Sequence, residues 1–432
     1  MKKISFMLVL LFVIVGCGRE SQEMTTVHTS EIDTPVTIDF WSFWGSQARR
    51  PIIEEIIADF NESNESVQVK HTYNPYGDIW TKELAAISAG NPPDVVINDI
   101  NATRIRGDKQ RAEDLSEFFE DDFSGQYFPN LWDAVSNDNG IYGIPFNTDT
   151  RVLFYNKNHF KEVGLDPKKP PKTWNELTEY ARMLDKKTDS TFNRLGFYPL
   201  YNVDAGLWLI NANGENYVDD SGHPSVDSEI NKDVFEWLLE WKNHYGTDTI
   251  NRYQASVDNQ QSHPFFTQEL SMIVATGTFY NEFKQWGQDF DVGVAFIPEY
   301  EPGTGHTSWG GGFVAEIPYG AKNKEESWQF IKHLTGFDSQ TKWGYLNFDN
   351  VAHIEASNAV PDNFVNNPVD AAIYEVLAAN MTHTILTPTP SEIPNYADLA
   401  NAVFEEIILE RITIEEGLTK LQHELEQAYE AN

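Results

Sequence analysis

Apolar residues recur along this chain at two spacings, and the two spacings alternate. Val36 to Phe40 is a short run rich in β-forming residues, and apolar residues then recur at spacings of one, three and four between positions 52 and 60. The first pattern favours a strand, and the second places an apolar face on a helix. The apolar run 95–97, which follows Pro93 and Asp94, is typical of a strand buried on both faces of a parallel sheet. Repeated strand–helix units predict an α/β fold with an open parallel sheet, whose ligands bind at the carboxyl ends of the strands.

The same alternation continues to the C-terminus. The patterns Thr173-x-x-Glu176 and Thr413-x-x-Glu416 are typical of capping boxes, in which both side chains accept hydrogen bonds from backbone N–H groups at the start of a helix. About 400 residues exceed what one hydrophobic core usually serves, so two domains are expected. The further expected elements are strands at 67–69 and 150–155 and helices at 77–89, 174–184, 235–245, 327–334, 396–410 and 414–428.

The N-terminus has the features of an export signal. Lys2 and Lys3 precede an apolar run at 4–16, which is too short to span a bilayer and fits a signal peptide. The run ends at Cys17, the only cysteine in the chain, in a sequence that resembles the lipobox of bacterial lipoproteins. This predicts a signal peptide at 1–16, a lipid anchor on Cys17 and a polar tether over 17–35, at the extracytoplasmic face of a cell membrane. The alternative is an ordinary signal peptide with an incidental cysteine.

Charge and aromatic content narrow the choice of partner. The chain has 66 acidic against 31 basic residues and a formal net charge of −35. Such a surface repels nucleic acid and anionic headgroups, so neither is expected as a partner, and a polyanionic ligand is disfavoured. A saline or alkaline habitat would also explain the acidity. Aromatic residues make up 13% of the chain, with 12 tryptophans, which raises the expectation of a sugar site only modestly because aromatic residues are first of all core material.

No sequence pattern of catalysis, cofactor binding or metal binding stands out. The glycines 310–312 lack the following lysine of a phosphate-binding loop, and the histidines have no zinc-ligand spacing. The acidic pairs Asp121-Asp122 and Asp219-Asp220 leave a surface glycosidase open as an alternative, although both lie in polar loop sequence. We therefore expect a protein that is not an enzyme and that holds neither metal nor cofactor.

An ordered series of motifs resembles the extracellular solute-binding proteins of carbohydrate ABC importers, the family of maltose-binding protein, along nearly the whole mature chain. Relatives often carry Gly-x-Leu-Pro-x-Arg where this chain has Gly344 to Asp349, so an acid stands in place of the arginine and the identity of the sugar stays open. The motifs are, in order, Phe40-Trp41-Ser42-Phe43-Trp44-Gly45, Gly90-Asn91-Pro92-Pro93-Asp94-Val95-Val96, Tyr142-Gly143-Ile144-Pro145-Phe146-Asn147-Thr148-Asp149-Thr150, Gly293-Val294-Ala295-Phe296-Ile297-Pro298, Trp309-Gly310-Gly311-Gly312-Phe313 and Ile317-Pro318-Tyr319-Gly320-Ala321.

The resemblance implies a fold, a function and partners. The fold would be a two-lobed, periplasmic-binding-protein-like (type II) clamshell with three inter-lobe crossings. One lobe would comprise 36–148 plus 311–345, and the other 149–310 plus 346–432. The protein, expected to be a monomer, would capture a small carbohydrate, an oligosaccharide in the first instance, and hand it to membrane permease subunits. The same fold binding a polyol, glycerol phosphate or a uronate is one alternative, and an adhesin or scaffold is another.

Sugars present C–H patches that suit aromatic faces and hydroxyl groups that suit carboxylates, amides and hydroxyls. Some of the candidate residues have structural alternatives: Asp99 could cap a helix, Asp149 could pin the hinge, and Trp41 and Trp208 could belong to the core. The expected ligand-binding residues are Trp41, Trp44, Asp99, Asn147, Asp149, Trp208, Thr276, Trp286, Trp309 and Gly310.

Overall fold

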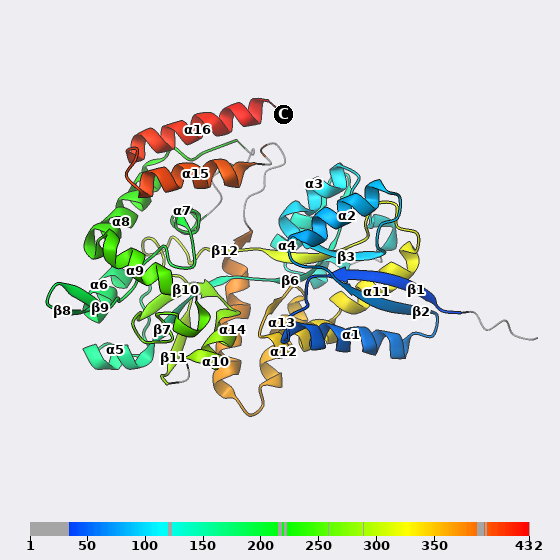
Figure 1. The fold of residues 1–432 in the computed structure, drawn as a ribbon, viewed down its shortest axis with the longest axis horizontal. Helices are drawn as coiled ribbons and strands as arrows, with labels where there is room; N and C mark the ends of the chain where they lie inside the picture. The colour runs from blue at the N-terminus through cyan, green and yellow to red at the C-terminus, as the bar shows by residue number, and fades with distance from the viewer. Residues whose placement is uncertain are drawn as a thin grey trace, which may run out of the picture. The chain divides into compact units, whose positions relative to one another are not determined.

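The computed structural model describes residues 34–119, 123–214, 218–219, 223–257, 259–287, 289–386, 393 and 395–431 (Figure 1). The expected signal peptide, Cys17 and nearly all of the expected tether lie outside these residues. Residues 35–432 form one unit, and its described residues contain both of the larger sheets and the helices that cover them.

A six-stranded sheet combines three early strands with three from later in the chain. β1 is parallel to β2 and β3, as the strand–helix alternation predicts. β13 runs antiparallel to β3 and β6, so the expectation of a wholly parallel sheet is wrong. Because β13 arrives from the other half of the fold, it begins at the end of the sheet where β3 finishes. In sheet order the strands are β14 (Asn350–Val351), β6 (Ile144–Thr148), β13 (Gly312–Glu316), β3 (Val95–Asp99), β1 (Val36–Ser42) and β2 (Val67–Tyr73).

A second, three-stranded sheet is antiparallel throughout. β7 (Arg151–Asn156) lies at its centre, between β10 (Met272–Thr276) and β11 (Val292–Ala295). The strand expected at 150–155 is thereby confirmed, but its neighbours run against it. The remaining strands form three small pairs, β4 (Ser136–Asn137) with β5 (Gly140–Ile141), β8 (Lys186–Thr188) with β9 (Thr191–Arg194) and β12 (Ser308–Gly310) with β15 (Thr384–Leu386).

Helices pack on both sheets, and every helix predicted from periodicity is present. Figure 1 shows the last two, α15 and α16, lying side by side. The helices are α1 (Arg49–Ser63), α2 (Asp78–Ser88), α3 (Thr103–Asp108), α4 (Pro129–Val135), α5 (Lys157–Val163), α6 (Trp174–Leu184), α7 (Ala205–Asn213), α8 (Glu229–Tyr245), α9 (Thr247–Val257), α10 (Phe279–Trp286), α11 (Lys324–Thr335), α12 (Phe337–Asn347), α13 (Ile354–Ala359), α14 (Pro368–Asn380), α15 (Tyr396–Ile408) and α16 (Ile414–Glu430).

The two predicted capping boxes differ in outcome. At α16 both bonds of the box are present, from Glu416 N–H to the Thr413 hydroxyl and from Thr413 N–H to the Glu416 carboxylate. At α6 the Thr173 hydroxyl accepts from Glu176 N–H, but the Glu176 carboxylate accepts from Lys172 N–H, one residue before the cap. The second half of that box is therefore wrong, although the predicted start of the helix is confirmed.

Two hydrophobic cores divide the described residues. The first core joins the six-stranded sheet to α1, α4, α11, α12 and α13, and the second joins the three-stranded sheet to α6, α7, α8, α14, α15 and α16. The chain passes between the two cores within 146–152 and 297–314, and more than once after that: Phe348 lies in the second core, Val351 in the first, Val360 in the second and Met381 in the first. We call the two halves the first lobe and the second lobe.

Phe348, just after the expected boundary at 345, lies in the second core as expected, but the chain then returns to the first lobe. β14 pairs with β6, and Val351 and Ala356 are buried in the first core. Residues 350–356 therefore pack with the first lobe rather than with the second, because their apolar side chains complete its core. The other expected lobe boundaries stay predictions.

A buried ionic cluster lies within the first lobe. The buried residues of α2 are the apolar Ile79 and the charged Glu83. The Glu83 carboxylate forms an ion pair with Arg106, whose Nε donates to Glu316 at 2.8 Å. Burial raises the pKa of Glu83 to about 7, against the attraction of Arg106. Glu83 is buried because its charge is met by a guanidinium that the helical periodicity does not reveal.

Candidate functional site

Aromatic residues gather at the carboxyl ends of the parallel strands. Phe43 follows β1 and Tyr76 follows β2, and their ring centroids are 5.2 Å apart. Phe43 also contacts Phe313 at 4.7 Å, and Tyr76 contacts Trp80 at 5.1 Å. We call these four residues the aromatic group. Since ligands of such sheets bind at the carboxyl ends of the strands, the group lies where a ligand is expected.

An acidic residue ends the third parallel strand beside this group. Asp99 is the last residue of β3 and is paired with Phe313 across the sheet. Its carboxylate caps the following turn by accepting from Asn101 N–H at 2.9 Å, as the structural alternative proposed. Burial raises the pKa of Asp99, and the charge of Asp149 raises it further. The pKa of Tyr76, whose ring is 63% exposed, is raised by burial of its hydroxyl and by the charges of Asp99 and Asp149. The two carboxylates and the Tyr76 hydroxyl are therefore electrostatic neighbours.

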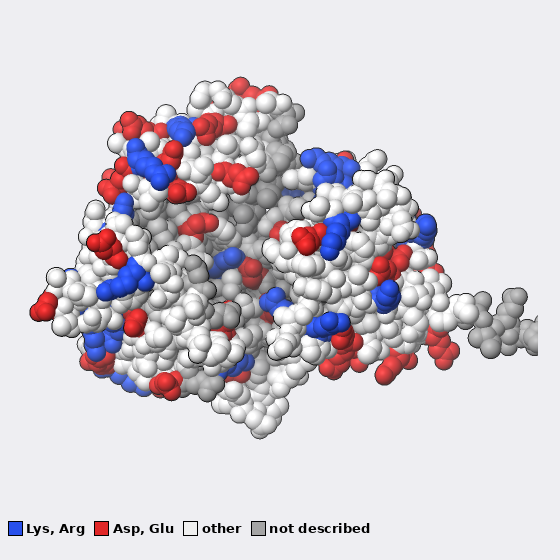
Figure 2. Space-filling view, viewed as in Figure 1, with Lys and Arg blue, Asp and Glu red and all other residues white. Residues whose placement is uncertain are grey.

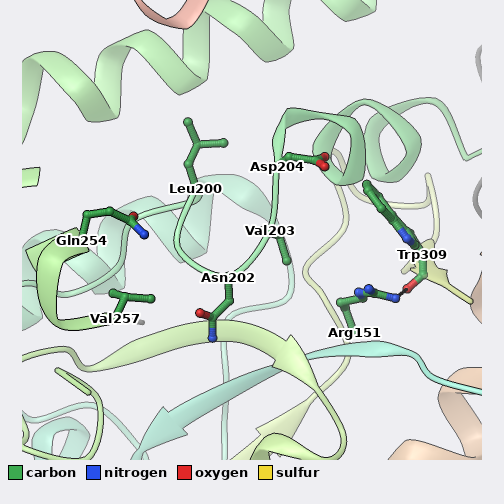
Figure 3. Close-up of a pocket in the computed structure, with 8 residues that line it drawn as sticks. All are labelled: Arg151, Leu200, Asn202, Val203, Asp204, Gln254, Val257 and Trp309. Carbon is green, nitrogen blue, oxygen red and sulfur yellow. Dashed lines mark hydrogen bonds between the residues drawn. The ribbon is translucent and has the colours of Figure 1, made fainter. Parts of the chain in front are cut away.

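The second lobe contributes a pocket of about 340 Å³ (Figure 3). Asp204, at the start of α7, has its carboxylate pointing toward the indole of Trp309. Burial raises the pKa of Asp204, and the nearby positive charge of Arg151 opposes that shift. The pocket thus combines an aromatic face, an acid and a base. Its lining residues are Arg151, Leu200, Asn202, Val203, Asp204, Gln254, Val257 and Trp309.

Arg151 and Asp149 connect this pocket to the inter-lobe crossings. The Arg151 guanidinium lies 5.4 Å from the ring centroid of Trp309 and donates to the Trp309 carbonyl at 3.1 Å. It also forms an ion pair with Asp149, whose Oδ1 accepts from Gly311 N–H at 3.1 Å. Because Asp149 also acts on Asp99 and Tyr76, it is the common neighbour of the aromatic group and the pocket.

Three further expected residues lie close to Asp149, and a ligand contact by any of them stays a prediction. Gly310 passes so near that an added Cβ would lie 2.2 Å from the Asp149 carbonyl, which explains the need for glycine there. Thr276 is paired with Arg151 across the second sheet. The Asn147 amide is buried and donates to Asp349 at 2.9 Å. Asp349, the acid that replaces the arginine of relatives, thus binds the first crossing.

The structure does not support a ligand contact for two of the expected tryptophans. Trp44 is 1% exposed and lies in the first core, with its ring 4.6 Å from that of Trp343. Trp208 is fully buried in the second core, and its indole N–H donates to the Pro199 carbonyl at 2.8 Å. Both indoles have their faces covered by protein and therefore present no surface to a ligand.

Trp41 and Trp286 lie apart from the residues around Asp149. The half-buried Trp41 donates its indole N–H to Asp39 on the same strand at 2.7 Å. Trp286 ends α10 with 38% of its surface exposed, and the pocket beside Trp309 does not include it. A role for either residue in ligand binding stays a prediction.

Sequence reasoning missed most of the lining of this site. Tyr76 and Trp80 come from a segment without a distinctive motif, and Asp204 looks like an ordinary helix cap. Phe313 ends one of the family-like motifs without having been expected to bind a ligand. Of these missed residues Arg151 has the clearest sequence signal, since it stands two residues after Asp149 at the first crossing.

Neither a membrane-spanning helix nor a metal site is found where the structure is described. Over those ranges no helix is long and apolar enough to cross a bilayer, and no group of three or more His, Cys, Asp or Glu residues could hold a metal ion. Of the acidic pairs, Asp121, Asp122 and Asp220 lie outside the described residues. Figure 2 shows the surface hollowed, with acidic and basic side chains on the walls of the hollow.

Comparison with solved structures places the fold among sugar-binding proteins. CpMnBP1 with mannobiose bound is 25% identical in sequence, with a TM-score of 0.74 over 90% of this chain and 99% of that one. The sugar-binding protein MalE from Xanthomonas citri has a TM-score of 0.77 at 19% identity, over 92% of this chain and 98% of that one. The two-lobed α/β fold expected from the sequence is thus confirmed.

Sequence comparisons agree with the structural ones. A protein of Brucella abortus (strain 2308) that is named as a binding protein is 23% identical over 389 residues, 83% of this chain and 85% of its own length. The sn-glycerol-3-phosphate-binding periplasmic protein of Escherichia coli O1:K1 / APEC is 30% identical over 273 residues, 61% of each chain. The model of the bacterial extracellular solute-binding proteins matches residues 44–341, more than half of the chain. This chain therefore belongs to the bacterial extracellular solute-binding protein family.

Proposed function

We propose that this protein is the lipid-anchored receptor of an ABC importer and that it captures a sugar, most simply an oligosaccharide, outside the cytoplasm. The observation that supports this proposal is the meeting of exposed or half-buried aromatic rings with carboxylates around Asp149. Aromatic faces stack on the C–H patches of sugars, and carboxylates accept charge-assisted bonds from hydroxyl groups. Solved neighbours described as bound to mannobiose or named as sugar-binding support the same ligand class.

Binding would act through closure of the two lobes about their crossings. A ligand shifts such an equilibrium only by its differential affinity for the closed state. The aromatic group belongs to the first lobe and Trp309 to the second, so a ligand that touches both would bind the closed state more tightly. The closed form would then be the form that the permease subunits recognise.

Replacing Trp309 with Ala is expected to weaken sugar binding at least about tenfold, because the pocket loses its aromatic wall. The first step is a thermal-shift screen of the wild type over mono- and oligosaccharides, since a ligand at 100 times its Kd adds about 2.7 kcal/mol of stability. The affinity of Trp309→Ala is then measured by calorimetry for each sugar that binds.

Phe337→Ala is the control, because it removes an exposed aromatic ring that lies outside the pocket and was not expected to bind a ligand. Equal losses in the two variants would contradict the assignment of Trp309. Recovery of the intact sugar after incubation is also expected, because we propose binding without turnover. Release of shorter sugars would instead support the glycosidase alternative.

Membrane attachment is proposed to depend on Cys17. Two acyl chains on one residue make a stable anchor, whereas a single chain binds reversibly. Cells that express the full chain should incorporate a palmitate label into the wild type and into Trp309→Ala, but not into Cys17→Ala. Since Cys17 is the only cysteine, a label that persists in Cys17→Ala would refute attachment through its sulfur.

A second candidate ligand is a small anion such as a glycerol phosphate. Two observations favour it: Arg151 lines the pocket, and the relative from Escherichia coli is named for sn-glycerol 3-phosphate. The contacts that Arg151 already makes decide between the two candidates.

A further inference from the structure

Among the described residues that line the pocket beside Trp309, Arg151 is the one basic residue. A guanidinium with free N–H groups binds phosphate or carboxylate in a bidentate manner, so an uncommitted arginine would favour an anionic ligand. Here the guanidinium is already engaged by the Asp149 carboxylate, by the Trp309 carbonyl and by the face of the Trp309 ring. Both hydrogen bonds are made by Nη1, and the charge of the guanidinium is therefore met within the protein by the Asp149 carboxylate.

From this geometry we infer that Asp149 is a specificity-determining residue, because its carboxylate neutralises Arg151 and thereby restricts the site to uncharged sugars. The inference rests on the proposed sugar-binding function and names the ligand class of that same site.

The acidic residues around the pocket also disfavour an anionic ligand. Asp204 lines the pocket beside Arg151, and Asp99 belongs to the same electrostatic neighbourhood as Asp149. Among these residues three carboxylates accompany one guanidinium, so their summed formal charge is negative. A phosphate or a uronate entering the site would be repelled at short range, since only partial screening by water operates in a half-buried pocket. Sugar hydroxyl groups can donate to the same carboxylates without that repulsion.

The contacts of Asp149 allow its charge to be removed without removing its structural hydrogen bonds. Its Oδ1 accepts from Gly311 N–H, and the amide oxygen of an asparagine accepts the same bond. Asp149→Asn therefore keeps the size, the link to the second crossing and an acceptor for Arg151. Only the negative charge is removed, so Arg151 loses the carboxylate with which it forms an ion pair, and Asp204 is the remaining acid that lines the pocket beside it.

The test compares neutral and anionic ligands on the wild type and on Asp149→Asn by calorimetry at pH 7.5. The anionic probes are sn-glycerol 3-phosphate and glucuronate, and the neutral probes are the sugars from the thermal-shift screen. The wild type should bind neither anion measurably, and Asp149→Asn should gain at least about tenfold in affinity for one or both. Arg151→Gln added to Asp149→Asn should abolish that gain.

Asp291→Asn is the charge-matched control. It removes one negative charge from the exposed pair with Lys161 and leaves the pocket unchanged, so it should gain no affinity for either anion. An Asp149→Asn protein that binds sugar but gains no anion would overturn the inference. Wild-type protein that binds an anion as tightly as any sugar would overturn it without a variant, even if Asp149→Asn fails to fold. If no sugar binds the wild type, the proposed function fails, while a gain of anion binding in Asp149→Asn would still support the role of Asp149.

Discussion

Arg106→Met is expected to lower the free energy of unfolding by about 3–5 kcal/mol, because it strands buried carboxylates without a counter-charge. Arg106 pairs with Glu83 and donates to Glu316, and all three side chains are buried within the first lobe. Methionine fills a similar volume, so the loss of charge dominates over the loss of packing. Urea unfolding followed by circular dichroism measures the change.

The control for this variant is Arg50→Met. Arg50 pairs with Glu54 across one helical turn, and both side chains are exposed. An exposed pair of this kind contributes about 0.3–0.5 kcal/mol. A loss at Arg106 no larger than the loss at Arg50 would contradict the account of the buried cluster.

The same cluster predicts the direction of a pH effect. Burial raises the pKa of Glu83 from its ordinary value of 4.5 to about 7, so between these values the folded state binds more protons than the unfolded state. This group therefore makes the protein less stable as pH rises from 4.5 to 7. Without the Arg106 guanidinium the pKa of Glu83 rises further. The loss in the free energy of unfolding caused by Arg106→Met should therefore be larger at pH 8 than at pH 5. A deficit independent of pH would mean that packing, rather than charge, was lost.

Trp208→Ala is expected to destabilise the protein by about 3–5 kcal/mol, which is the usual cost of removing a large aromatic side chain from a core. Trp208 is fully buried, with ring centroids 5.4 Å from Trp174 and 5.1 Å from Trp237. Its loss also leaves the Pro199 carbonyl without a donor. Denaturant unfolding is the measurement, and sugar affinity is measured below the unfolding transition.

Trp286→Ala is the comparison for stability, since truncating an exposed side chain changes the free energy of unfolding by about 0.5 kcal/mol or less. Trp208→Ala should lose stability and keep sugar affinity wherever it remains folded. Trp309→Ala should show the opposite pattern. A Trp208→Ala protein with normal stability and weakened sugar binding would contradict the assignment of Trp208 to the core and support its role in ligand binding.

Apolar periodicity and capping residues were sufficient to predict the helices that they indicated. The isoleucines of α1 are buried as their spacing predicts, and Thr413 and Glu416 form the predicted box at the start of α16. Periodicity reports which face of a helix is apolar, and a cap depends on residues a single turn apart. Both signals are complete within a short stretch of chain. The order of motifs added the two-lobed architecture by resemblance.

Strand direction and the lining of the site depended on contacts between distant residues. β13 runs antiparallel to β3 because it enters from the second lobe, and no local pattern records that origin. Trp208 and Trp309 are both indoles expected to contact a ligand, and only packing covers the first while leaving the second beside a pocket. Composition and motif order thus determined the family, whereas the tertiary structure decided which indoles can face a ligand. It also decided that the charge of Arg151 is met by Asp149, because burial and charge pairing are properties of side chains brought together by folding.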